Sequence, residues 1–430
     1  MGQRREALWE YLRGALWVLP VAAVLFALGL GSALSKIDIP QHSFLHRLVF
    51  EGTSDDARTL LIGIAGTMIT VIALMLGLTV VALQLSSTQF SPRLLRNFLR
   101  DRPNQLVLSS FVATFAYSTA GLYTVGVSGG TRTQDYPRLA VTGAIVLLFL
   151  SLFALVYEVH HVAHSMQVDE IMRSVEDRTQ EVIREVLVTP CEGPPPVIPD
   201  HAVPLKARRS GYVQTIHPEA LIELAERLPA CVAVAHRVGE HVVSGAPLAW
   251  IWRSDDGPVD EPAAVSAAHR SVRLGFERTL EQDAALGMRQ LVDIASKALS
   301  PAVNDPYTAV QAIDHLAVIL ASLARREHGT TVHTTAAGTT VTVPGYAFAD
   351  YLDLACAQIR RFGSKEPTIA RELIEMLSST AHNADHADRH AAIRAELELI
   401  VTDAERDIVQ PEDLKPLRAA ADALRAQLRC

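Results

Sequence analysis

The sequence predicts a membrane protein with four transmembrane helices, followed by a cytoplasmic α+β region. Four long apolar segments lie before residue 160, and the two central segments contain no Asp, Glu, Lys or Arg. The chain of 430 residues is 49% hydrophobic, and its mean hydropathy is +0.19. Charged residues and turn-forming Gly and Pro return after residue 160, over a stretch long enough for one or two packed domains.

The apolar segments cover residues 15–34, 60–85, 105–127 and 139–157. At about 1.5 Å per residue, a helix of this length spans about 30 Å of hydrocarbon. The first segment follows basic residues, as a signal peptide does, but it exceeds the roughly 7 to 15 apolar residues of a signal sequence. We therefore expect a transmembrane domain over residues 1–160.

Basic residues suggest the orientation of these spans. They precede the first segment and fill the polar elbow between the second and third segments: Arg4, Arg5, Arg13, Arg93, Arg96, Arg100 and Arg102. Four spans place both groups, and everything after residue 160, on one side of the membrane. The positive-inside rule makes that side the cytoplasm, so both termini are expected to be cytoplasmic.

After the last span, helical spacing predicts an unbroken helical stalk over residues 161–189, which ends at a Pro-rich connector. Residues 197–255 alternate with period two and predict a small β-rich module with a short helix at 218–227. Residues 263–430 predict a mostly helical domain with a β-hairpin near 330–343. Its expected helices cover 263–278, 283–299, 306–327, 347–362, 366–379, 386–407 and 411–428.

The run from Val238 to Ile251 resembles the half-repeat of biotinyl and lipoyl barrel-sandwich domains, which implies a barrel-sandwich-like β module. The resemblance does not extend to the cofactor. No lysine lies between Lys206 and Lys297, so nothing in the module can be biotinylated or lipoylated. We expect no cofactor.

Uncharged polar residues follow single faces of the second and third spans. The pore-lining candidates are Thr67, Thr70, Ser110, Thr114, Tyr117 and Ser118. Small hydroxylated residues permit close helix packing and hydrogen bonding between helices. The same face could line a permeation path when several subunits assemble, and the sequence leaves both interpretations open. The spans contain no Asp, Glu, Lys or Arg, which argues against a proton-coupled carrier.

A second group of candidates lies where the fourth segment leaves the membrane: Glu158, His160, His161 and His164. Histidine titrates near neutral pH, so a cluster at the mouth of a pore could sense pH. Interfacial imidazoles bonded to headgroups or to a neighbouring helix explain the same residues, and we expect no metal site.

The segment LEQDAALGMRQLVDIASKALSPAVNDPYT, over residues 280–308, carries the strongest resemblance. Together with the elbow SSTQFSPRLLRNFL and the pair His160-His161, it resembles a bacterial family of predicted membrane proteins named domain of unknown function 2254. The resemblance spans nearly the whole chain. It implies four spans, a cytoplasmic soluble region and the bacterial plasma membrane.

Residue chemistry in this segment predicts a helix ending at Ser300-Pro301 and a second helix capped by Asp305 with Pro306 in its first turn. A structural corner accounts for the pattern. Alternatively, Asn304 and Asp305 line a ligand pocket with Arg289 or Lys297, because a helix start favours anions.

These patterns favour an oligomeric channel or pore gated by its cytoplasmic domain, since four spans are too few to enclose a pore alone. The alternative is a membrane-anchored sensor or scaffold that binds a ligand or partner. An enzyme ranks last, because no nucleophile, base and orienting group combine at a motif spacing. The net charge of −8 argues against nucleic acid, and the four cysteines show no zinc spacing.

Overall fold

A computed structural model describes residues 17–37, 49–89, 102–125, 136–165, 167–186, 196–253, 257, 259–336 and 338–429. The chain forms two compact units, Met1–Gln167 and Val168–Cys430. The expected elbow between the second and third spans lies mostly in residues 90–101, outside the described residues. Each unit is therefore considered by itself.

The first unit contains four apolar helices: α2 (Val18–Leu34), α3 (Ser54–Gln89), α5 (Arg102–Thr124) and α6 (Arg138–Ser165). The helices α3, α5 and α6 are long and apolar enough to cross a membrane, and α2 is a shorter apolar helix of 17 residues. Their positions agree with the four predicted apolar segments. The first predicted segment begins before residue 17, where the description starts.

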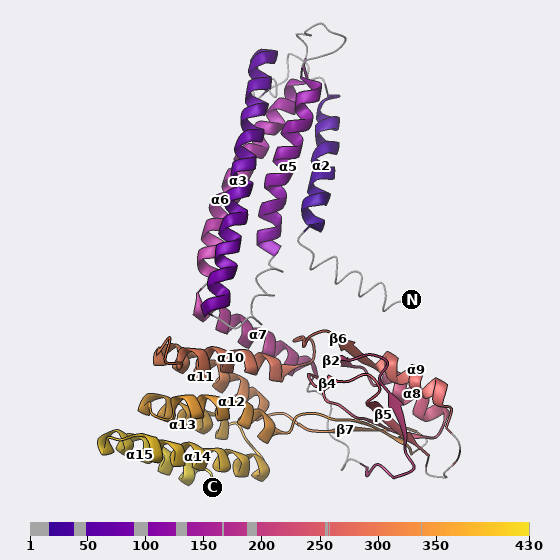
Figure 1. Ribbon diagram of the computed structural model, residues 1–430, viewed down its shortest axis with the longest axis vertical. Helices are drawn as coiled ribbons and strands as arrows, with labels where there is room; N and C mark the ends of the chain where they lie inside the picture. The colour runs from indigo at the N-terminus through magenta and orange to yellow at the C-terminus, as the bar shows by residue number, and fades with distance from the viewer. Residues whose placement is uncertain are drawn as a thin grey trace. The chain divides into compact units, whose positions relative to one another are not determined.

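Helix α5 occupies the centre of the first unit, where it packs against α2, α3 and α6 (Figure 1). Phe111 and Tyr117 of α5 are almost completely buried, together with Leu61 of α3 and Ala144 of α6. The outer faces of the other helices carry large exposed apolar side chains such as Phe26 and Phe153, as expected of surfaces that contact lipid.

The second unit begins with α7 (Val168–Val186), and this corrects the predicted stalk. The sequence predicted one unbroken helix, whereas α6 ends at Ser165 and α7 begins at Val168. Asp169 and Glu170 lie in the first turn of α7, where acidic side chains stabilise a helix N-terminus. One face of α7 is buried and packs against two helices of the second unit, α10 and α11, so α7 belongs to a folded core.

The described strands form two open sheets, and not the expected barrel-sandwich-like module. One sheet has the order β1-β5-β3-β8-β7 and the other β4-β2-β6. The strands are β1 (Val203–Lys206), β2 (Gly211–Ile216), β3 (Cys231–Val234), β4 (His241–Val242), β5 (Pro247–Trp252), β6 (Val272–Gly275), β7 (Thr331–Thr334) and β8 (Thr340–Val343). The predicted hairpin β7-β8 is present, but β8 pairs in parallel with β3. The hairpin therefore extends the sheet of the β-rich module.

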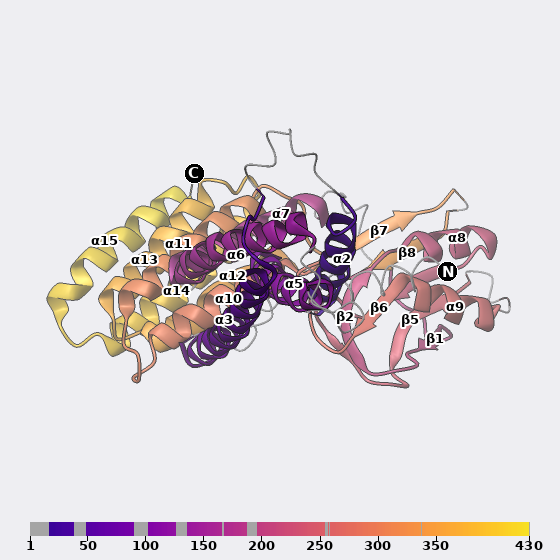
Figure 2. The same cartoon turned by 90° about the horizontal axis from the view of Figure 1, so that it is seen from above.

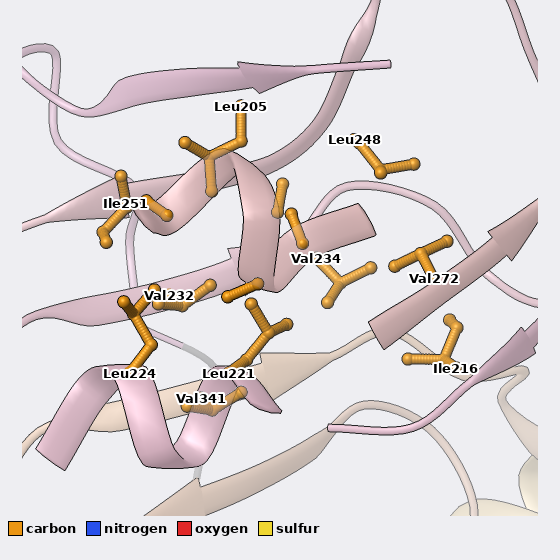
Figure 3. Close-up of a cluster of buried hydrophobic side chains, with 14 of the residues drawn as sticks. Leu205, Ile216, Leu221, Leu224, Val232, Val234, Leu248, Ile251, Val272 and Val341 are labelled. Carbon is orange, nitrogen blue, oxygen red and sulfur yellow. The ribbon is translucent and has the colours of Figure 1, made fainter. Parts of the chain in front are cut away.

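Two helices, α8 (Glu219–Arg227) and α9 (Glu261–Ser271), share one apolar core with the sheets. Figure 3 shows Leu221 and Leu224 of α8 facing Val232 and Ile251 of the five-stranded sheet. The sequence predicted a longer helix over 263–278, which is wrong after residue 271. Val272 and Leu274 are buried while Arg273 between them is exposed, and this alternation places β6 beside β2.

Six further helices form three hairpins that stack on one another in the described part of the second unit. The helices are α10 (Ala284–Ala298), α11 (Pro306–Leu323), α12 (Phe348–Gly363), α13 (Pro367–Ala381), α14 (Ala387–Asp407) and α15 (Pro411–Gln427). Along one side α12 packs between α10 and α14, and along the other α13 packs between α11 and α15. Figure 2 shows these hairpins at one end of the second unit and the strands at the other. Their sequences show no repeat that would have predicted the stack.

Candidate functional site

The structure separates the six pore-lining candidates into two groups, because α5 is central and α3 is not. Four of them lie on α5, where Thr114, Tyr117 and Ser118 are buried within the subunit. The Thr114 hydroxyl lies 2.8 Å from the Ser151 hydroxyl of α6, and the Ser110 hydroxyl donates to the Val107 carbonyl at 2.7 Å. Of these four, Thr114 and Tyr117 bond from α5 to α6, whereas Ser110 is half-buried and bonds within its own helix.

Tyr117 has the most specific setting of the four. Its hydroxyl donates to the Ala140 carbonyl of α6 at 2.8 Å. A Cβ atom at Gly143 would lie 2.5 Å from the Tyr117 hydroxyl oxygen, and one at Gly31 would lie 3.3 Å from the ring. The two glycines therefore leave the space that the tyrosine occupies between α2 and α6. Gly31 and Gly143 are functional packing positions that the sequence did not single out.

Thr67 and Thr70 on α3 are exposed, unlike the α5 group. Their hydroxyls donate to the carbonyls of Gly63 at 2.8 Å and Gly66 at 3.2 Å, one turn earlier in the same helix. A Cβ atom at either glycine would meet nothing within 4 Å. We call Gly63, Gly66, Thr67 and Thr70 the small-residue face of α3. It lies near the middle of the candidate span Ser54–Val81.

The predicted pH-sensing group is spread around the last turns of α6. Glu158 is buried, with 2% of its surface exposed, whereas His160 is exposed. The His161 ring stacks on Tyr157, with ring centroids 5.8 Å apart. The side chain of His164 lies outside the described residues. Among the described residues, no group of three or more His, Cys, Asp or Glu side chains could hold a metal ion.

The residues of the predicted ligand pocket lie at or near a capped helix corner. Asp305 caps α11 by accepting from the Thr308 amide at 3.2 Å and from the Thr308 hydroxyl at 2.6 Å. These bonds hold the pKa of Asp305 below its usual value. Asn304 is exposed with a φ of 51°, and Arg289 is paired with Asp293 at 3.2 Å. The cap prediction is confirmed, and neither Arg289 nor Asp305 is left without a partner.

The buried half of the same segment is α10, which is the central helix of the second unit. It packs against α7, α11 and α12. Gly287 allows the closest approach, because a Cβ atom there would lie 1.9 Å from the Thr179 hydroxyl of α7. Thr179 is completely buried, and its hydroxyl donates to the Val175 carbonyl at 2.6 Å. The signature therefore encodes a helix crossing as well as a corner.

A charged cluster joins the sheets to the helices, and the sequence did not predict it. The Arg278 guanidinium donates two hydrogen bonds to the Asp283 carboxylate, at 2.8 and 2.9 Å, and Asp283 also caps α10 by accepting from the Leu286 amide. Gly239 lies against this pair with a φ of 90°, and a Cβ atom there would be 2.6 Å from Asp283 Oδ2. Burial lowers the pKa of Arg278, but the hydrogen bonds that Arg278 donates to Asp283 and the negative charge of that carboxylate together outweigh burial, so the pKa rises.

A second arginine completes the cluster. Arg237 donates to Glu240 at 2.9 Å and to Asp350 of α12 at 2.9 Å, and it lies 4.4 Å above the centre of the Tyr346 ring. Both arginines are thus satisfied by carboxylates, so the cluster fastens the sheet region to the helical hairpins. Gly239 is the one residue in the sequence that indicates this cluster. It lies between Val238 and Glu240, in a tight turn whose positive φ favours glycine.

Comparison with known proteins identifies the family of this chain. Residues 13–379 match the family model described as "Predicted membrane protein (DUF2254)". The chain belongs to this family. Two relatives are the uncharacterized proteins Rv1290c of Mycobacterium tuberculosis and Mb1321c of Mycobacterium bovis. Each is 42% identical over 433 residues, which covers 98% of this chain and 82% of the relative. No solved structure matches the chain significantly.

Proposed function

We propose that this DUF2254 protein is a homo-oligomeric, non-enzymatic channel of the bacterial plasma membrane, in which neighbouring subunits meet along α3. Its second unit lies in the cytoplasm together with both chain termini and gates the path. The lipid bilayer and further copies of the same chain are its partners, and nucleic acid is not. The family description supports a membrane location, and the mycobacterial relatives support a bacterial one.

The observation that carries this proposal is the small-residue face of α3. Gly63, Gly66, Thr67 and Thr70 are exposed on the isolated subunit, near the middle of a candidate span. Glycine in a helix interior costs about 1 kcal/mol relative to alanine, so two exposed glycines need a compensating contact. Small residues on membrane helices permit close approach of a second helix. The adjacent hydroxyl oxygens can line a polar path.

Cysteine crosslinking tests the interface. Thr70→Cys is introduced into a background in which Cys191, Cys231 and Cys430 are serine, while the buried Cys356 is kept. Mild oxidation in native membranes should give a crosslinked dimer. The matched control is Phe153→Cys on α6, which is 73% exposed. Equal crosslinking at the two positions, or none at Thr70→Cys, would remove α3 as the interface.

Ion flux from liposomes tests the path. The double variant Thr67→Val, Thr70→Val removes both hydroxyls at nearly constant volume, and it should lower the flux several-fold. Thr79→Val is the matched control, because Thr79 lies about half a helical turn from Thr70 around the axis of α3. A chain that crosslinks through α3 but carries no more flux than empty liposomes is an oligomer without a pore.

The burial of the α5 hydroxyls favours a second candidate function, a membrane-anchored sensor or scaffold. Thr114, Tyr117 and Ser118 are buried within the subunit, so among the six pore-lining candidates only Thr67 and Thr70 are exposed. In this alternative the helices anchor the chain, and the second unit binds a ligand or partner. A monomeric protein in mild detergent, with no flux after reconstitution, would favour the anchor.

A further inference from the structure

We propose that one end of the β4-β2-β6 sheet is a docking surface for anionic lipid headgroups. We call it the lipid-docking end and define it by Lys206, Arg208, Arg209, Val243 and Phe276. Lys206 is the last residue of β1, the other four lie just outside the strands, and the assignment does not depend on channel activity. The surface would bind phosphate-bearing headgroups through its cations and place the Phe276 ring at the edge of the acyl chains.

Hydrogen bonds bring two of these turns together. The first turn, residues 207–210, connects β1 to β2, and the second, residues 243–246, connects β4 to β5. The Gly245 amide donates to the Ala207 carbonyl at 2.8 Å, and the Ser244 amide donates to the Ser210 hydroxyl at 2.9 Å. These bonds hold the two turns together, and Lys206 at the end of β1, Arg208 and Val243 are all exposed.

Strand β6 brings Phe276 to the same end of the sheet. Tyr212 of β2 pairs with Gly275, and a Cβ atom at Gly211 would lie 2.7 Å from the Gly275 carbonyl oxygen. The Arg209 guanidinium donates to the Leu274 carbonyl, two residues before Phe276. Phe276 follows directly after this contact and is 95% exposed, so its ring projects from the sheet next to the basic turn.

The charge of this end differs from that of the chain as a whole. The net charge of the chain is −8, yet residues 206–210 and 243–246 contain three basic residues and no acidic residue. One carboxylate, that of Glu277, follows Phe276 in the sequence, while Glu240 accepts from Arg237 and Glu281 accepts from Arg273. Three cations against one adjacent carboxylate leave this end with an excess of positive charge.

A lipid surface fits this chemistry better than another protein does. Basic residues beside an exposed aromatic ring are the combination that holds proteins at an anionic bilayer, since the cations attract headgroups and the ring enters the interface. The second unit is covalently joined to the apolar helix α6, because only Met166 and Gln167 lie between Ser165 and Val168 in the sequence.

Spin-label accessibility in the full-length protein tests the proposal. Phe276→Cys is labelled with a nitroxide in the background with Cys191, Cys231 and Cys430 changed to serine. The protein is reconstituted into vesicles of phosphatidylcholine alone or mixed with phosphatidylglycerol. Collision with oxygen, which partitions into lipid, is compared with collision with an uncharged nickel chelate, which stays in water. The matched control is Val409→Cys, because Val409 is also 95% exposed.

In the anionic vesicles, the label at position 276 should lose several-fold of its nickel collisions and gain oxygen collisions, while the label at position 409 is unchanged. Adding Lys206→Gln and Arg208→Gln should restore the nickel collisions. Arg209 is kept because it bonds the backbone of β6. Equal accessibility in both vesicles overturns the proposal. Protection that is independent of lipid charge means that a protein surface covers this end, and parallel changes at position 409 mean non-specific adsorption; both results also overturn it.

Discussion

The central helices of the two units, α5 and α10, both pack closely against neighbouring helices, but the glycines that allow this lie on the neighbours of α5 and on α10 itself. In α5 the large residue lies on the central helix, and the glycines that receive Tyr117 lie on the neighbours α2 and α6. In α10 the glycine lies on the central helix, and the side chain that approaches it, Thr179, lies on the neighbour α7. Both arrangements bring helix backbones close together.

The two helices differ more in how their polar groups are satisfied. Polar groups around α5 make uncharged hydrogen bonds, such as that of Tyr117 to the Ala140 carbonyl. The N-terminus of α10 instead depends on the ion pair Arg278-Asp283, of which Asp283 is almost completely buried. A lipid environment excludes charges that it cannot pair, whereas a water-soluble core can bury one beside a partly exposed guanidinium. Breaking a polar contact should therefore cost far more at α10 than at α5.

The largest expected effect is that of Arg278→Ala. Removing one partner of a buried ion pair leaves a charge uncompensated, which costs about 3 to 5 kcal/mol of unfolding free energy. The Asp283 side chain keeps only 1% of its surface exposed, so solvent cannot replace the guanidinium. Chemical unfolding of the second unit, followed by circular dichroism, measures the effect. Lys415→Ala is the control, because Lys415 and its partner Glu412 are both exposed; an equal loss in both variants would contradict the special role of the α10 pair.

The second-largest loss of unfolding free energy is expected for Gly287→Ala. The added methyl group would overlap the Thr179 hydroxyl and push α7 away from α10, at a cost of about 1 to 3 kcal/mol. The double variant Gly287→Ala, Thr179→Ala removes the overlapping atoms and should recover part of the loss in the same unfolding experiment. If the single and double variants are equally stable, the close crossing of α7 and α10 does not limit stability.

A smaller effect is expected from Glu372→Gln on α13. Burial, aided by Glu375 and Asp314, raises the pKa of Glu372 from 4.5 to about 7. Between these values the folded state holds a proton that the unfolded state has released, so this residue lowers stability as the pH rises through the window. The side chain is only half-buried, so solvent reduces the penalty to about 1 kcal/mol. The variant should be more stable than the wild type at pH 8 and equal to it at pH 4.

The smallest effect is expected from Tyr117→Phe, which removes the hydrogen bond to the Ala140 carbonyl and keeps the ring. Hydrogen bonds between membrane helices average about 0.6 kcal/mol. Gly143→Ala should cost more than this, because its methyl group would meet the Tyr117 hydroxyl oxygen. Thermal stability of the detergent-solubilised protein ranks the two variants. A loss for Tyr117→Phe as large as that for Arg278→Ala would end the contrast between α5 and α10.

Local sequence signals predicted the elements well. The apolar runs identified the helices of the first unit, Asp305 and Pro306 identified the start of α11, and alternation identified β2 and the hairpin β7-β8. The predictions failed where contacts with neighbouring elements determine whether a segment is a helix or a strand. Nothing local ends a helix at residue 271, because Val272 to Gly275 become a strand only when β2 is beside them. The break between α6 and α7 likewise lies where the apolar sequence of α6 gives way to the charged sequence of α7.

The sequence by itself determined which segments are apolar enough for a membrane, which residues cap the corner after α10, and which family the chain joins. Each of these depends on residue type at short spacing, where periodicity and capping act. The tertiary structure decided which polar faces are available. It buried the hydroxyls of α5 and exposed those of α3, because only packing determines which helix is central. It also gathered Arg209, Val243 and Phe276 at one end of a sheet, through pairings between residues far apart in the chain.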